Sequence, residues 1–71
     1  MIKNCYEIII KPCFIHIKYY KKIIDIDSNK IIINTCDNSI NITGTNLIIS
    51  AMDEYEIVIK GIIKSIEFIN E

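Results

Sequence analysis

Short apolar runs recur about every eight residues along the chain, and polar or turn-forming residues end each run. Inside many runs apolar and polar residues alternate: Ile40 and Ile42, for example, alternate with Asn41 and Thr43. Successive side chains of a strand point to opposite faces, so this alternation predicts strands with one buried face. Regularly spaced short strands with turn signals between them indicate an all-β domain.

The expected strands are residues 6–11, 13–20, 22–27, 30–35, 39–43, 47–51, 56–60 and 62–69. The last run also fits a helix, because Ile62, Ile63, Ile66 and Ile69 have helical spacing. A strand is favoured there, because β-branched residues are poor helix formers and no capping residue precedes the run. The expected inward-facing set is Ile15, Ile17, Ile24, Ile26, Ile31, Ile33, Ile40, Ile42, Leu47, Ile49, Ala51, Ile57 and Ile59, and Cys13 and Tyr19 share the face of Ile15 and Ile17.

Turn residues separate these runs. Ser28 and Asn29 form a good two-residue turn. The stretch ITGTNLIIS predicts a strand, a tight turn built on Gly44 and Asn46, and a second strand, because glycine adopts positive φ without penalty. Gly61 marks a further turn or bulge.

Two architectures fit about seven or eight short strands in 71 residues. The first is a single-domain antiparallel sandwich or roll covering residues 1–71. The second is a short β-solenoid, which would leave open ends that need capping. The varied loop sequences favour the sandwich or roll.

Composition and charge narrow the possible functions. Isoleucine dominates the apolar residues, and the net charge is −1, with lysines gathered in the first half and acidic residues in the second. A nearly neutral chain with few aromatic residues is a weak candidate for nucleic-acid binding. No apolar run approaches the ~20 residues of a membrane-spanning helix, and no signal peptide is evident. We therefore expect a cytoplasmic protein.

The cysteines offer a possible metal or nucleophilic site. Cys5, Cys13 and Cys36 are odd in number, which favours reduced thiols acting as small hydrophobic residues. Cys13 and His16 have a spacing that could begin a zinc site, with the other two cysteines as further ligands. In a strand, however, residues 13 and 16 face opposite sides, which argues against both zinc and a cysteine–histidine nucleophile. We expect no metal, cofactor or catalytic residue.

Paired carboxylates are a second candidate for chemistry. Asp25 and Asp27 share one strand face, while Asp53 and Glu54 share one loop. Such pairs can act in acid–base catalysis or bind Ca²⁺. The first pair alternates with isoleucine, as a solvated strand face does, so we interpret it as structural.

The sharpest local feature is the run Lys18-Tyr19-Tyr20-Lys21-Lys22. Lysines interleaved with aromatic rings can hold a nucleic-acid backbone while bases stack on the rings. They can equally meet anionic lipid or a protein partner. The structural alternative is a strand end whose rings cover the core and whose lysines prevent edge pairing. The run is our candidate interaction surface, and a small nucleic-acid-binding β-domain is the alternative function.

Several strands also place apolar residues on the face expected to meet solvent: Ile9, Ile32, Ile48 and Val58. A small domain with apolar residues on both faces usually covers one of them with a partner. We expect either a homo-oligomer or a partner protein to cover it, and no small-molecule substrate.

The second half of the chain resembles the YabP/YqfC family of small sporulation proteins from endospore-forming Firmicutes. The segments that carry the resemblance are SINITGTNLIIS and EIVIKGIIKSIEF. Their shared patterns are Ile-x-Gly-x-x-Leu-x-Ile at residues 42–49 and Glu-Ile-x-Ile-x-Gly-x-Ile-x-x-Ile-x-Phe at residues 56–68. These are structural residue types, and the first half agrees with the family only in rhythm.

The resemblance implies a protein made during sporulation, in the mother cell, that contributes to building the spore envelope or coat. It implies no catalysis and carries over no catalytic residue. The implied partners are further copies of the chain or a sporulation envelope or membrane protein, with recruitment to the forespore surface.

Overall fold

The computed structural model describes residues 5–70. These residues form one sheet with strand order β1-β2-β6-β5-β4-β3, and every neighbouring pair is antiparallel. The described part of the chain contains no helix. The six strands are β1 (Glu7–Lys11), β2 (Phe14–Lys18), β3 (Lys22–Ile26), β4 (Lys30–Asn34), β5 (Asn38–Met52) and β6 (Glu56–Asn70).

The all-β antiparallel class is confirmed, and residues 62–69 are strand as expected. The strands number six because β5 and β6, of 15 residues each, both combine two of the expected short strands. The solenoid alternative is wrong, because stacked coils pair their strands in parallel and this sheet has only antiparallel pairs.

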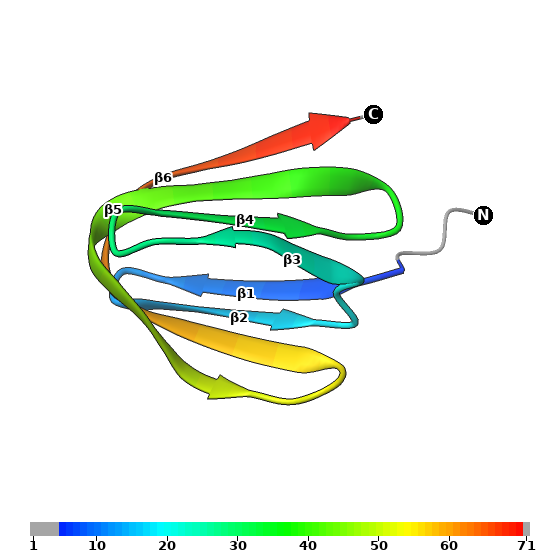
Figure 1. Cartoon of the computed structure of the whole chain (residues 1–71), viewed down its shortest axis with the longest axis horizontal. Coiled ribbons are helices and arrows are strands. Elements are labelled where there is room, and N and C mark those ends of the chain that lie inside the picture. Colours follow the sequence, from blue (N-terminus) through cyan, green and yellow to red (C-terminus); the bar gives the residue numbers. More distant parts are fainter. Residues whose placement is uncertain (1–4, 71) are drawn as a thin grey trace.

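The sheet folds over on itself because β5 and β6 both bend in the middle (Figure 1). One half, called here the β1–β2 layer, contains β1, β2, residues 56–60 of β6 and residues 48–52 of β5. The other half, the β3–β4 layer, contains β3, β4, residues 38–43 of β5 and residues 62–70 of β6. The molecule is therefore a small roll made from a single sheet.

The core lies between the two layers. Burying an isoleucine side chain contributes about 1.5–3 kcal/mol, so this isoleucine cluster is the main source of stability. Both layers supply it, and Leu47 fills the inside of the bend in β5. The buried hydrophobic residues are Ile15, Ile17, Ile31, Ile33, Ile40, Ile42, Leu47, Ile57 and Ile59.

Two register shifts turn expected core residues outward. A shift between Ile23 and Asp25 places Ile23 against the core and leaves Ile24 about half exposed. A second shift, between Ile49 and Ala51, pairs Ala51 with outward-facing Val58. The inward predictions for Ile24 and Ala51 are wrong, because an extra residue in a strand changes the face on which neighbouring residues lie. Ile26 lies opposite buried Ile31 as expected, but it is 51% exposed on the edge strand β3, so its prediction as a core residue is also wrong.

The bends replace the expected tight turn at Gly44 and Asn46. β5 runs through both residues without reversing direction, and Asn46 takes the left-handed conformation with φ 55°. Gly61 has φ 137° and marks the bend of β6. A Cβ at Gly44 would collide with the carbonyl group of Ile62, and a Cβ at Gly61 would lie 2.6 Å from the carbonyl oxygen of Asn46.

Two of the hairpin turns, β1–β2 and β3–β4, hold these bends in place. The β3–β4 turn accepts a hydrogen bond from Leu47 N to Ser28 O at 2.8 Å and another from Gly44 N to Asn29 O at 3.0 Å. The β1–β2 turn accepts one from Gly61 N to Cys13 O at 3.2 Å. The bends therefore use backbone donors that an interrupted sheet ladder would otherwise leave unpaired.

Replacing Gly44 with alanine should destabilise the fold by about 3 kcal/mol, because its Cβ meets backbone atoms that cannot move aside independently. Urea unfolding under non-reducing conditions measures the effect. Thr43→Ala, an exposed change in the same strand, is the matched control and should cost less than about 0.5 kcal/mol. A Gly44→Ala protein with the wild-type midpoint would contradict the close approach of β5 and β6.

Candidate interaction face

The structure divides the lysine–tyrosine run among different environments. Lys18 ends β2, between Glu7 on β1 and Glu56 on β6 in the sheet register. Tyr20 packs against the core, and its hydroxyl donates to the carbonyl oxygen of Asp53 at 2.8 Å. Tyr20 is thus part of the structural connection between the layers.

The other three residues of the run are exposed. Tyr19 is 55% exposed with φ 65°, a left-handed conformation that is uncommon for a bulky residue. Lys21 donates its backbone N–H to Asn34 O, and Lys22 begins β3. The run therefore offers one free ring, whereas single-stranded nucleic acid is usually bound by several stacking rings in a basic groove.

A more continuous surface is the outward side of the β1–β2 layer, called here the outer face. In the sheet register its middle residues form a row across four strands. Ile9 at one end of this row is 44% exposed. This apolar row consists of Ile9, His16, Val58 and Ala51.

Charged residues lie on both sides of the apolar row. The acidic row, nearer the β5–β6 turn, contains Glu7, Lys18 and Glu56. The basic row, nearer the bends, contains Lys11, Phe14, Lys60 and Ile48, and Ile48 is 60% exposed. The outer face therefore has an apolar centre between ends of opposite charge.

His16 and Glu56 make the direct polar contact on this face. His16 Nε2 lies 2.8 Å from Glu56 Oε1. Both side chains line a hollow of about 220 Å³. The remaining lining residues are Ala51, Met52, Asp53 and Val58. The contact supplies His16 with a polar partner within an otherwise apolar row.

The outward side of the β3–β4 layer has polar residues at its centre, with Ile24 and Ile69 each about half exposed nearer its edges. Its register places Asn41 between Ile32 and Glu67, and Thr43 between Lys30 and Ser65. Ile32, expected to contribute apolar surface, is flanked by these polar groups and half-buried. The three other such residues, Ile9, Ile48 and Val58, all lie on the outer face.

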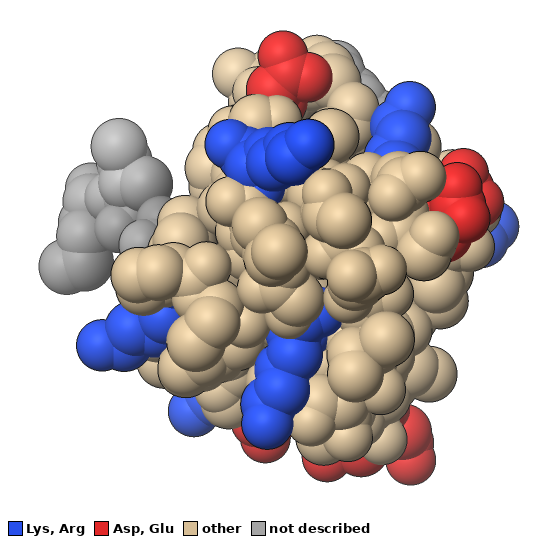
Figure 2. Space-filling model, turned by 90° about the vertical axis from the view of Figure 1, so that its left-hand side faces the viewer, with Lys and Arg blue, Asp and Glu red and all other residues tan. Residues whose placement is uncertain are grey.

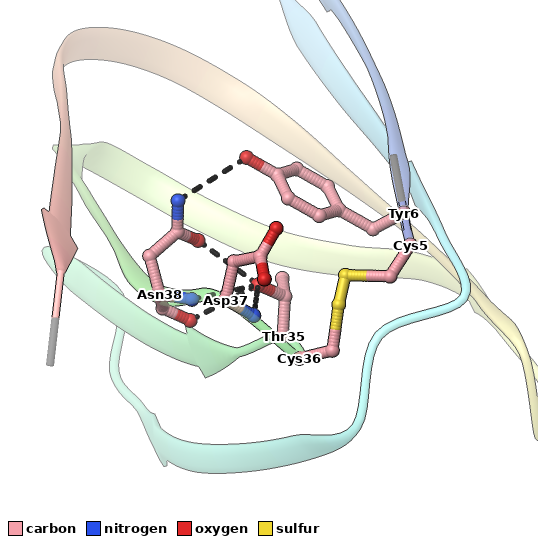
Figure 3. The surroundings of a disulfide bond; sticks show 6 residues. All are labelled: Cys5, Tyr6, Thr35, Cys36, Asp37 and Asn38. Carbon is pink, nitrogen blue, oxygen red and sulfur yellow. Dashed lines mark hydrogen bonds between the residues drawn. A yellow bond between two sulfur atoms is a disulfide. The ribbon is translucent and has the colours of Figure 1, made fainter. Parts of the chain in front are cut away.

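Cys5 and Cys36 form a disulfide, so the expectation of reduced thiols is wrong for this pair (Figure 3). Cys5 precedes β1 and Cys36 lies in the β4–β5 turn, 31 positions later, with Cα atoms 6.2 Å apart. Neither spacing nor an odd cysteine count identifies the pair, because it forms only when the two layers close. Cys13 is free and exposed in the β1–β2 turn.

Thr35 organises the turn that carries Cys36. Its buried hydroxyl oxygen accepts hydrogen bonds from the backbone N–H groups of Asp37 and Asn38 and lies 2.9 Å from Asn38 Oδ1 (Figure 3). Asn38 Nδ2 in turn donates to the Tyr6 hydroxyl at 3.4 Å. Sequence reasoning missed this network, although a threonine before an Asp-Asn turn was an available signal.

The suggested metal and nucleophilic sites are not assembled as expected. Cys13 and His16 lie on the β1–β2 turn and on the outer face, while Cys36 is bonded to Cys5. Among residues 5–70, the ligand atoms of Cys5, Cys36 and Asp37 come together within 4.8 Å of one another. Because the two sulfur atoms are bonded to each other, the Asp37 carboxylate is the one anionic ligand that remains in this cluster.

One carboxylate of each pair stabilises a turn, while Asp25 lies within β3. Asp27 Oδ1 accepts a hydrogen bond from Ser28 N in the β3–β4 turn. Asp53 Oδ1 accepts from Tyr55 N at 2.8 Å and Glu56 N at 2.9 Å. These two hydrogen bonds stabilise the carboxylate and hold the pKa of Asp53 below its ordinary value of 3.8. The bond from Tyr55 N–H has the larger effect.

Together these features define a small all-β domain with one apolar-centred outer face. The family model of the YabP family matches residues 8–71, so the chain belongs to the YabP family. Membership indicates a sporulation-related protein, and the YabP family is not known as a family of enzymes. Neither the curated proteins nor the solved structures gave a match. Residues 5–70 include no helix of the length and apolarity needed to span a membrane.

Loss of the disulfide should lower the free energy of unfolding by about 3–4 kcal/mol, because the bond closes a long loop in the unfolded chain. The test is urea unfolding of a Cys5→Ser/Cys36→Ser double variant, with Cys13→Ser as the matched control. Reductant should destabilise the wild type and the control, and leave the double variant unchanged. If reductant leaves the urea unfolding midpoint of the wild type unchanged, the disulfide bond is contradicted.

Asp53 should make stability fall in acid. The pKa of Asp53 is lower in the folded protein than its ordinary value of 3.8. Its contribution to folding stability is therefore fully present above pH 3.8, and it is lost as the pH falls through the lower folded-state pKa. Asp53→Asn keeps an acceptor oxygen and removes the charge. The melting temperature of this variant should therefore depend less on pH below about 4 than that of the wild type. Equal slopes for both proteins would rule out the contribution.

Proposed function

We propose that this protein is a non-enzymatic structural or assembly component of sporulation that contributes to spore envelope or coat formation through protein–protein contacts. The observation that carries the proposal is the outer face, where Ile9 and Ile48 are about half exposed at opposite edges of one layer and Val58 and Ala51 lie on the strands between or beside them. In a small domain such a surface is typical of a site covered by a partner.

Membership of the YabP family supports a role in sporulation, and the outer face supports action through protein–protein contacts. The sheet presents its apolar row on strands whose opposite sides form the core, so the surface is fixed in shape before a partner arrives. Pre-formed surfaces bind with little loss of conformational freedom. The proposed setting is the mother-cell cytoplasm, with recruitment to the forespore surface.

The test is complementation in an endospore-forming bacterium whose own copy of the gene is deleted. An Ile9→Asp/Ile48→Asp variant places charges on the outer face at positions that are already about half exposed. It should fold and accumulate but leave heat-resistant spore counts close to those of the deletion strain. The control, Thr43→Asp, changes an exposed residue on the β3–β4 layer and should complement fully.

Two results would contradict the proposal. Normal spore counts in the deletion strain would remove the role in sporulation. Full complementation by the Ile9→Asp/Ile48→Asp variant would remove the role of the outer face. Circular dichroism of both purified variants establishes that they are folded.

A further inference from the structure

The outer face carries opposite charges at its two ends. Glu7 and Glu56 lie in the acidic row, and Lys11 and Lys60 lie in the basic row. Each glutamate is four residues from the lysine on its own strand, which corresponds to about 13 Å. Viewed from the bend end, the molecule shows lysines standing apart on a mostly uncharged surface, with acidic groups towards the periphery (Figure 2).

This pattern is complementary to itself. Consider a two-fold axis that lies along the apolar row, parallel to the face and perpendicular to the strands. Rotation about it turns a second copy over, reverses its strands, and exchanges the acidic and basic rows. A contact formed in this way is isologous, with the same surface used by both copies.

We propose that the outer face binds a second copy of this chain in that arrangement, forming a symmetric dimer; the inference rests on the proposed function and names its partner. Glu7 of each copy lies over Lys11 of the other, and Glu56 lies over Lys60. The dimer therefore contains two Glu–Lys contacts of each kind.

The remaining residues of the face fit the same arrangement. The apolar row packs against its own copy, and faces of packed sheets lie about 10 Å apart, which leaves room for side chains to interdigitate. Lys18 of one copy meets the ring of Phe14 of the other, a favourable cation–aromatic contact. His16 already has Glu56 as a polar partner, so its burial leaves that ring nitrogen satisfied.

Charge decides between a second copy and other partners. A membrane or a nucleic acid presents one sign of charge and selects a surface of the opposite sign. The outer face instead has two glutamates on either side of Lys18 in one row and two lysines in the other, with each glutamate four residues from a lysine on its own strand. A second copy turned by the two-fold axis supplies both signs in the correct places.

The size of the face indicates how strong the contact is. Four strands and five residues along each cover about 20 by 17 Å, or about 340 Å² per copy. Standard stable interfaces bury about 800 Å² per partner. The dimer is therefore weak and depends on concentration, and it joins larger assemblies only where the protein is concentrated.

Sedimentation velocity across a concentration series tests the dimer with charge reversals on β1. Glu7→Lys alone places like charges opposite each other at both symmetric positions, and so does Lys11→Glu alone. Each should weaken dimerisation by about tenfold or more. The combined Glu7→Lys/Lys11→Glu variant restores opposite charges and should dimerise like the wild type.

Mixing the two single variants gives the sharpest test. A chain with Glu7→Lys carries two positive charges on β1 and a chain with Lys11→Glu carries two negative ones. The mixture should therefore form a heterodimer although each variant alone is mainly monomeric. The matched controls, Lys30→Glu and Glu67→Lys, reverse charges on the β3–β4 layer and should leave dimerisation unchanged.

Two outcomes would overturn the dimer. One is a protein that remains monomeric at all concentrations. The other is self-association that the β1 charge reversals do not change, which would assign the contact to another surface. A monomer whose Ile9→Asp/Ile48→Asp variant still fails in sporulation leaves the proposed function standing with a different partner. If the dimer forms but the Ile9→Asp/Ile48→Asp variant sporulates normally, the dimer stands and the proposed function of the outer face fails.

Discussion

The bend shared by β5 and β6 is the constraint on which the rest of the structure depends. If these strands ran straight, the sheet would be a single layer with its isoleucine face open to water. Bending both strands at the same level brings two halves of one sheet together and encloses Ile17, Ile33 and Ile59. The close approach of Gly44 to Ile62 and the left-handed Asn46 are local costs offset by this burial.

Alternation along the chain predicts much of the core but cannot reveal the breaks in its own pattern. Ile15, Ile31, Ile40 and Ile57 are buried as expected, because period-two strands that share one buried face leave little choice of register. Ile24 and Ala51 face outward because extra residues in their strands shift the register, and nothing in their local sequence marks those shifts.

The candidate site was only partly predictable for a similar reason. The exposed positions of Ile9 and Ile48 follow from strand parity, but their location on one face depends on β2 pairing with β6. That pairing joins strands about 40 residues apart, and local pattern carries no information on it. The Cys5–Cys36 bond likewise depends on closure of the two layers. The lysine–tyrosine run was conspicuous in sequence, yet the fold uses Tyr20 as an internal connection.

Asn38 contacts a residue near each end of the described chain. Its side chain donates to Tyr6, just before β1, and its backbone position is opposite Asn70 at the end of β6. Chain ends that lie at the surface can often be joined by a linker without loss of the fold. A circularly permuted version, joined across Asn38 and opened at the β5–β6 turn, would keep every strand pairing of the roll. The order of strands in space, and not their order along the chain, is thus what specifies this architecture.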